Sequence, residues 1–337
     1  MDLEMNNPAP VDTAAAKKRF SRLGLGAFLM LLITMVVSSV IGAVVAVVKP
    51  ELMDNKIFYL LLSFVPLYAV GVPIGILVIR KVPREAPERE SMPLGRWIVT
   101  AIICIFLMYA GNLIGIWVTS YLESAFGITS TNPLEQLITG ETLLPQILVT
   151  VILAPILEEL IFRRMMIDRM RVYGERLAVV TSALMFGLFH GNLSQFFYAF
   201  LLGLVFGYVY LRKGKLRYTA ALHMFVNLIG SVPGSLLMKY VDEDTLDALQ
   251  GAADPEQLRE LLSVPGVAAY YVFVLLIVAL GITGLVLLCV NAKRVHFEPA
   301  PQELPKGSRF STVWLNLGMI LLVLGCLGLF AASMLGM

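Results

Sequence analysis

Hydrophobic and polar positions alternate along this chain on the scale of whole segments. Long apolar runs, most of them 18 residues or more, are separated by short stretches that carry the charges. A helix of about 20 apolar residues is long enough to cross the roughly 30 Å hydrocarbon core of a bilayer. The pattern predicts nine such helices, over residues 24–48, 57–79, 97–121, 143–171, 177–191, 195–211, 217–238, 268–290 and 313–335.

The loops between these runs sort by charge. Basic residues gather before the first run and in every second loop, at 80–90, 163–176, 212–217 and 293–309. The other loops are poor in Lys and Arg, and the loop after the seventh run is acidic. Loops rich in Lys and Arg stay on the cytoplasmic side. The alternation therefore predicts a cytoplasmic N-terminus and an external C-terminus.

Composition agrees with a membrane protein. Of the 337 residues, 58% are hydrophobic and 15% are charged, whereas soluble domains have about 45–50% and about 25%. We expect an all-α polytopic protein, a bundle of about eight or nine transmembrane helices, multi-pass in the plasma membrane. The net charge of +2 and the lack of a basic patch with aromatic residues argue against a nucleic-acid partner. The three cysteines lie in apolar runs, without the spacing of a zinc site or disulfide framework.

The predicted runs divide the chain into five parts. Residues 1–22 form a cytoplasmic tail, 23–128 the N-terminal transmembrane helices, 129–240 a central core, 241–266 an external acidic segment and 267–337 the C-terminal transmembrane helices. Two external stretches have helical patterns of their own. Residues 129–140 predict a short interfacial helix, and 242–262 predict one or two acidic amphipathic helices.

A few polar side chains fall inside the apolar runs of the core. A charged group at mid-bilayer costs about 2.5–3.5 kcal/mol on insertion scales, so such groups are rare and usually functional. The set is Glu158, Glu159, Arg163, His190, His223 and Asn227. The last two are four residues apart, so both project from one helix face.

Helical geometry predicts how these groups meet. Glu159 and Arg163 are four residues apart and can form an ion pair, while Glu158 lies about 100° round the helix. A turn at Tyr173–Gly174 would join two antiparallel helices. Glu158 and His190 are each 16 residues from Gly174, or about 24 Å at 1.5 Å per residue. We therefore expect this carboxylate and this imidazole to face each other at one depth.

Such a set suits hydrolysis without a serine or cysteine nucleophile. A carboxylate and a histidine can act together as general base on a water, and a second histidine with an asparagine can stabilise an oxyanion. The sequence contains no GxSxG, HExxH, P-loop or Rossmann motif. Other interpretations stay open: a structural ion pair for Glu159 and Arg163, interhelical hydrogen bonds for each histidine, or a transporter's proton relay.

Three motifs in order carry a resemblance to a known family. "EELIFR" (158–163) fits EExxxR, "FGLFH" (186–190) fits FxxxH and "HMFVN" (223–227) fits HxxxN. Together they resemble the CAAX-protease and bacteriocin-processing family of intramembrane glutamic endopeptidases, over roughly residues 140–240.

The resemblance implies a role for each matching residue. Glu158 and His190 would activate water, and His223 and Asn227 would form the oxyanion hole. Glu159 and Arg163 would order the site. The implied activity is hydrolysis of a peptide bond in a membrane-associated protein or peptide, without a cofactor.

Two alternatives accompany this interpretation. One is a zinc-dependent mechanism, with the metal on Glu158, His190 and His223. The other is a non-catalytic immunity or sensor protein that binds a peptide in the same pocket.

Overall fold

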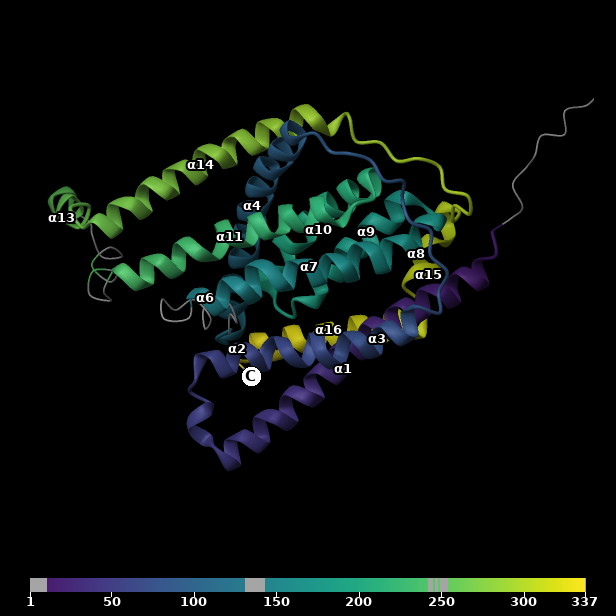
Figure 1. Cartoon of the computed structure of the whole chain (residues 1–337), viewed down its shortest axis with the longest axis horizontal. Helices are drawn as coiled ribbons and strands as arrows, with labels where there is room; N and C mark the ends of the chain where they lie inside the picture. Colours follow the sequence, from purple (N-terminus) through teal and green to yellow (C-terminus); the bar gives the residue numbers. More distant parts are fainter. Residues whose placement is uncertain (1–10, 131–142, 242–244, 246–247, 249–253, 337) are drawn as a thin grey trace, which may run out of the picture.

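A computed structural model describes residues 11–130, 143–241, 254–336 and the single residues Thr245 and Ala248. In this part of the chain all regular structure is helical (Figure 1). In chain order the α-helices are α1 (Thr13–Val48), α2 (Lys56–Val65), α3 (Val72–Ile79), α4 (Leu94–Phe126), α6 (Leu143–Gln146), α7 (Ala154–Glu159), α8 (Asp168–Met170), α9 (Glu175–Phe189), α10 (Leu193–Lys213), α11 (Leu216–Tyr240), α13 (Pro255–Leu261), α14 (Pro265–Ala292), α15 (Arg309–Val313) and α16 (Leu317–Met334).

Six short segments of other helical types continue or join these helices. The π-helical segments are η2 (Pro66–Gly71), η4 (Ile147–Leu153) and η5 (Leu160–Ile167). The 3-10 segments are η1 (Pro50–Leu52), η6 (Arg171–Tyr173) and η7 (Lys306–Ser308). Because η2, η4 and η5 run on from their neighbours, α2–α3 and α6–α8 each form one long, locally widened helix.

The prediction of an all-α polytopic membrane protein is confirmed. Within the described residues, 7 helices are long and apolar enough to cross a membrane: α1, Lys56–Ile79, α4, Leu143–Tyr173, α10, α14 and α16. The other two predicted runs also form helices but are not among these seven. The helix α9 has only 15 residues, and α11 is less apolar because it carries polar residues, including His223 and Asn227. The last predicted run is interrupted, because Asn316 caps α16 and separates it from α15.

The two external stretches are described only in part. Most of the helix predicted at 129–140 lies outside the described residues. Of the amphipathic stretch predicted at 242–262, α13 is described and is helical, as expected.

The loops that the charge pattern places on one side lie together at one end of the molecule. The backbone amide of Glu90 donates to the carbonyl of Lys213 at 3.0 Å, and that of Leu304 donates to the carbonyl of Tyr173 at 3.1 Å. In Figure 1, α13 lies at the opposite end of the long axis from α8 and α15. This arrangement fits the topology expected from the positive-inside rule.

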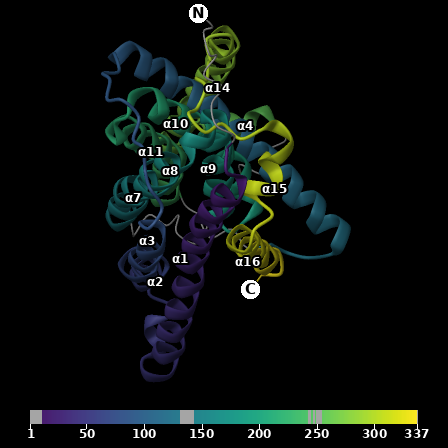
Figure 2. The same ribbon diagram turned by 90° about the vertical axis from the view of Figure 1, so that its right-hand side faces the viewer.

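The first and last transmembrane helices pack closely together. A Cβ added to Gly24 would lie 2.5 Å from the backbone of Gly318, and the amide of Gly318 donates to the Ser21 hydroxyl at 3.1 Å. Small residues allow membrane helices to approach this closely. As a result α16 lies beside α1, as Figure 2 also shows, and the two ends of the chain support the core from one side.

The core helices pack around α10, which contacts both α4 and α9. Two glycines permit these contacts, since a Cβ at Gly111 would lie 2.5 Å from the backbone of Tyr198 and one at Gly203 would lie 3.0 Å from that of Ala183. The α8–α9 turn falls at Gly174, as predicted, with φ of +139°. This conformation suits glycine alone.

Candidate active site

The polar residues singled out in the sequence come from three neighbouring parts of the core. Glu158 and Glu159 end α7, Arg163 lies in the adjoining η5, and His223 and Asn227 lie on α11. The structure places His190 just after the last residue of α9, where it forms the C-cap rather than lying inside the helix. The backbone turn there uses Gly191 at φ +70°.

Glu159 and Arg163 form the ion pair that their spacing predicts. Both side chains are fully buried, with Nε of Arg163 at 2.9 Å from Oε2 of Glu159. Nη1 of Arg163 donates to the Ser182 hydroxyl at 3.1 Å, and the guanidinium lies 5.1 Å from the centre of the Phe186 ring. Buried charges must be paired and hydrogen-bonded to be tolerated. The Glu159 carboxylate is therefore neutralised locally, which also fits the structural interpretation of this pair.

His223 lies between the two glutamates. Its Nδ1 is 3.2 Å from Oε1 of Glu159, and its Nε2 is 3.6 Å from Oε2 of Glu158. Glu158 also accepts a hydrogen bond from the Tyr68 hydroxyl at 3.1 Å. The side chain of Glu158 is 22% exposed, while that of Glu159 is completely buried. Of the adjacent carboxylates, Glu158 is therefore the one that a water or substrate can reach.

His190 is oriented by the helix that precedes it. Its Nδ1 lies 2.9 Å from the carbonyl oxygen of Phe186. A carbonyl only accepts, so Nδ1 carries the proton and Nε2 of the neutral ring is an acceptor. The Phe186 ring packs edge-on against both imidazoles, with centroids at 4.9 Å from His190 and 5.5 Å from His223. The two histidines thus flank one aromatic side chain.

Glu158 and His190 form no direct hydrogen bond or ion pair in the part of the chain that the structure describes. The imidazole in direct contact with Glu158 is that of His223. The expected facing of Glu158 and His190 across the hairpin is therefore not a direct contact.

The turn after His190 is held by one asparagine. Asn192 caps α10, accepting from the amide of Gln195 at 2.9 Å, and its own side-chain amide donates to the carbonyl of His190 at 2.9 Å. Ser, Thr, Asn and Asp are preferred at such N-caps because they satisfy free backbone amides. Asn192 is a turn residue, as its position after Gly191 suggests, and it fixes the backbone that carries His190.

Asn227 binds a backbone carbonyl that has lost its helical donor. In η4 the amide of Ala154 donates to the carbonyl of Val149, five residues earlier. At the same spacing the donor for Thr150 would be residue 155, which is proline and has no N–H. Nδ2 of Asn227 donates to the Thr150 carbonyl instead, at 2.8 Å. Among the described residues, this is the one hydrogen bond that the Asn227 side chain donates.

Further polar residues of α11 face the same neighbour. Ser231 and Ser235 follow Asn227 at intervals of four, and the Ser235 hydroxyl donates to Oε1 of Gln146 at 2.9 Å. With His223 they form a polar stripe along the side of α11 that packs on α6, η4 and α7. The four-residue repeat His223, Asn227, Ser231 and Ser235 is visible in the sequence and could have indicated all four members of this stripe.

Each π-helical segment contributes to the site. Tyr68 lies in η2, Thr150 in η4 and Arg163 in η5. π-helical bulges are rare and are frequent at functional sites, because the wider turn redirects side chains and frees backbone groups. Tyr68 was missed by the sequence analysis. The prolines at 66 and 73 on either side of it mark the irregular helix, but nothing in the sequence connects it with Glu158.

The zinc-dependent alternative requires three donors about 2 Å from one point. Among the described residues, no group of three His, Cys, Asp or Glu side chains meets in this way. Of the proposed ligands, His190 and His223 each have Nδ1 engaged and Nε2 directed elsewhere, and Nε2 of His223 lies 3.6 Å from Oε2 of Glu158. The zinc-dependent mechanism therefore stays an alternative prediction, which removal of metal ions tests.

The site lies within the segment that a family model matches. Residues 140–229 match the family described as Type II CAAX prenyl endopeptidase Rce1-like. The resemblance indicated by the three motifs is thereby confirmed. The matched segment contains all six polar residues and covers about a quarter of the chain. No curated protein and no solved structure matches the chain.

Proposed function

We propose that the protein is an intramembrane endopeptidase in which Glu158 and His190 activate a water that attacks a peptide bond of a membrane-associated protein or peptide. The observation that carries this proposal is the difference between the adjacent glutamates. Glu159 is paired with Arg163 and both side chains are fully buried, whereas Glu158 is partly exposed and lies beside His223. The family match over residues 140–229 supports a peptidase of the CAAX-protease type.

The water would lie between Glu158 and His190. Since Nδ1 of His190 is held by the Phe186 carbonyl, its Nε2 is available to accept a hydrogen bond or a proton. The Glu158 carboxylate would accept the second hydrogen bond of the same water. Two acceptors on one water raise its nucleophilicity and can contribute about 10²–10⁴-fold to the rate.

His223 and Asn227 would stabilise the oxyanion of the tetrahedral intermediate. Nε2 of His223 lies 3.6 Å from Oε2 of Glu158, and this role requires a proton on that nitrogen. Nε2–H of His223 would then turn from Glu158 to the substrate oxygen as negative charge develops there. The free amide proton of Asn227 would be the second donor. Loss of one such donor costs about 10²–10³ in kcat.

A proteomic comparison of native membranes tests the activity. The strains would carry the wild-type chain, Glu158→Gln, His190→Ala or, as matched control, Glu51→Gln, which removes an exposed carboxylate far from the site. Peptides generated by the wild type and the control should be absent from the two site variants. If the peptide profile is the same in all four strains, the protease proposal fails, and the alternative of a non-catalytic peptide-binding immunity or sensor protein takes its place.

A further inference from the structure

A second hollow lies apart from the glutamate site, on the other side of α10. It is a cavity of about 1290 Å³ between α10 and α14, with α4 at its base. Both helices pack on α4, and a Cβ at Gly284 of α14 would lie 2.5 Å from the Ile102 carbonyl oxygen of α4. The close contact of α14 with α4 leaves the groove open along α10. We call it the α10–α14 groove.

The groove has an apolar inner part. Its wall there is made of aliphatic side chains from α4, α9, α10 and α14, among them Val99, Ile103, Val179, Val205, Leu287 and Leu288. The helices α4, α10 and α14 are long and apolar enough to span the membrane, and these aliphatic side chains lie four to nine residues in from the helix ends that carry the basic rim. An apolar groove in this position is suited to a hydrocarbon chain.

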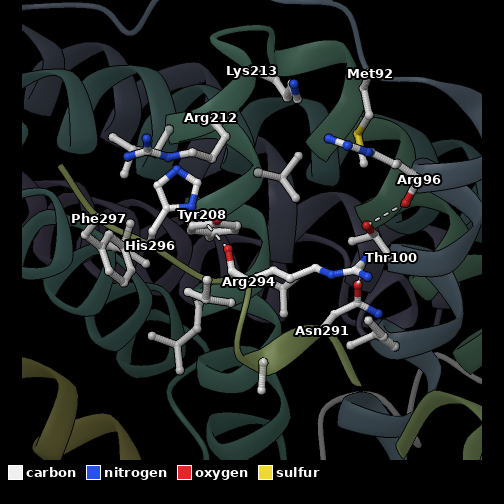
Figure 3. Close-up of a pocket in the computed structure, with 18 of the residues that line it drawn as sticks. Met92, Arg96, Thr100, Tyr208, Arg212, Lys213, Asn291, Arg294, His296 and Phe297 are labelled. Carbon is white, nitrogen blue, oxygen red and sulfur yellow. Dashed lines mark hydrogen bonds between the residues drawn. The ribbon is translucent and has the colours of Figure 1, made fainter. Parts of the chain in front are cut away.

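The outer rim of the groove is rich in cations (Figure 3). Some of them are neutralised: Arg212 pairs with Glu175 and with Glu298, and Lys213 pairs with Glu90 at 2.6 Å. The ammonium of Lys213 also lowers the pKa of the Glu90 carboxyl, through a hydrogen bond and its charge. These side chains are already engaged with carboxylates.

Three rim arginines form no ion pair with a carboxylate in the described part of the chain: Arg96, Arg176 and Arg294. Arg294 is held by Oδ1 of Asn291 at 3.2 Å, and the Arg176 guanidinium lies 5.3 Å from the centre of the Phe297 ring. Among the carboxylates on the rim, only Glu88 lacks an ion pair there. The rim therefore has an excess of positive charge beside an apolar groove.

The rim is formed by the loops that the charge pattern places in the cytoplasm. The inner leaflet of a cell membrane carries anionic lipids, and basic pockets between transmembrane helices on that side bind their headgroups. We propose that the α10–α14 groove binds an anionic phospholipid, with one acyl chain along the aliphatic wall and the phosphate between Arg96 and Arg294. A free phosphate would use the rim alone and would have no use for the apolar wall.

Lipid binding can be measured on the full chain by native mass spectrometry in detergent. Phosphatidylglycerol and phosphatidylcholine with identical acyl chains are titrated separately. We expect phosphatidylglycerol to bind more tightly. In the double variant Arg96→Gln/Arg294→Gln its binding should weaken about tenfold or more, since each basic residue near the surface contributes about 1 kcal/mol. Binding of phosphatidylcholine should change little.

Two control variants separate the groove from general charge effects. Lys18→Gln/Arg22→Gln removes two exposed cations from the same predicted face, on α1, and should leave phosphatidylglycerol binding unchanged. Arg96→Lys/Arg294→Lys keeps the charge and should retain most of the binding. Equal losses in the Gln variants of both regions, or no preference for phosphatidylglycerol, would overturn the proposal. Displacement of the lipid by millimolar glycerol phosphate would also overturn it, in favour of a soluble anion.

Discussion

The side-chain amide of Asn227 on α11 donates a hydrogen bond to the backbone carbonyl of Thr150 in η4, at 2.8 Å. The bond exists because Pro155 removes the backbone donor that the π-helical spacing would supply. It fixes the position of Asn227 relative to Glu158, because Glu158 lies about two turns after Thr150 on the continuous helix formed by η4 and α7. A gap in the backbone hydrogen bonding of one helix thus orients a side chain of another.

This relationship predicts a coupling between Pro155 and Asn227 in stability. Asn227→Ala leaves the Thr150 carbonyl without a donor and should cost about 1–3 kcal/mol of unfolding free energy. In a Pro155→Ala background the restored backbone N–H can serve that carbonyl, so the same substitution should cost less. The measurement is a double-mutant cycle of unfolding in detergent. Strictly additive effects would show that Pro155 and Asn227 do not share this carbonyl.

The buried pair of Glu159 and Arg163 predicts an asymmetry between single and double variants. Arg163→Met leaves a fully buried carboxylate without its counter-ion, which should destabilise the protein by about 3–5 kcal/mol. Glu159→Gln/Arg163→Met removes both charges and should recover much of this loss. Unfolding midpoints and the yield of folded protein from membranes would report it. If the double variant is as unstable as Arg163→Met, the packing of the arginine matters more than its charge.

Glu158 should be dispensable for stability but required for activity. Glu158→Gln keeps the shape of a partly exposed side chain, so the unfolding midpoint should move by no more than a few degrees, while peptide hydrolysis should fall at least 10²-fold. Comparison with Arg163→Met distinguishes a residue needed for activity, Glu158, from one needed for stability, Arg163. A Glu158→Gln enzyme with near wild-type turnover would assign the proposed chemistry to another residue.

Tyr68 should act as a positioning residue for Glu158. Tyr68→Phe removes the hydroxyl that donates to Oε1 of Glu158 but keeps the ring in the helix. We expect kcat to fall about tenfold to a hundredfold with little change in KM, because a hydrogen bond to a charged group contributes about 1.5–3 kcal/mol. Steady-state kinetics on a substrate peptide in nanodiscs would measure this. An equal loss in a Glu158→Gln background would mean that Tyr68 acts independently of Glu158.

Activity should survive removal of metal ions. Peptide hydrolysis would be followed after prolonged incubation with a strong chelator, and the zinc content of the purified protein would be measured alongside. We expect unchanged turnover and less than stoichiometric zinc. Loss of activity with chelator, restored by added zinc, would favour the alternative in which Glu158, His190 and His223 bind the metal.

Much of the site could be predicted because its chemistry conflicts with its surroundings. Glu159 and Arg163 stand out in an apolar run, and their four-residue spacing predicts the pair that the structure contains. The turn at Gly174 could also be placed, because polar residues interrupt the hydrophobic run there. The direct contact of Glu158 with His223 could not be predicted in this way. Counting residues from the turn gives depth along the helix, but the contact with His223 depends on how α11 packs against α7.

Other parts of the site depend on structure that a regular helix does not predict. Thr150 and Tyr68 lie in π-helical segments, where side chains depart from the 100° spacing assumed for an α-helix. Tyr68 is 90 residues from Glu158 along the chain, and no local pattern relates them. The α10–α14 groove likewise depends on tertiary packing, because it forms where α10 and α14 both pack against α4.

The sequence by itself determined that the protein is an all-α polytopic membrane protein, which loops are basic, and which polar residues are too costly to be in lipid without a purpose. These properties follow from local hydrophobicity and charge, since the bilayer acts on each segment separately. Only the tertiary structure decided that Glu158 is partly exposed, that His223 lies between the two glutamates and that Tyr68 binds Glu158. Those outcomes depend on contacts between helices, which are set by side-chain packing and by backbone groups left free at proline.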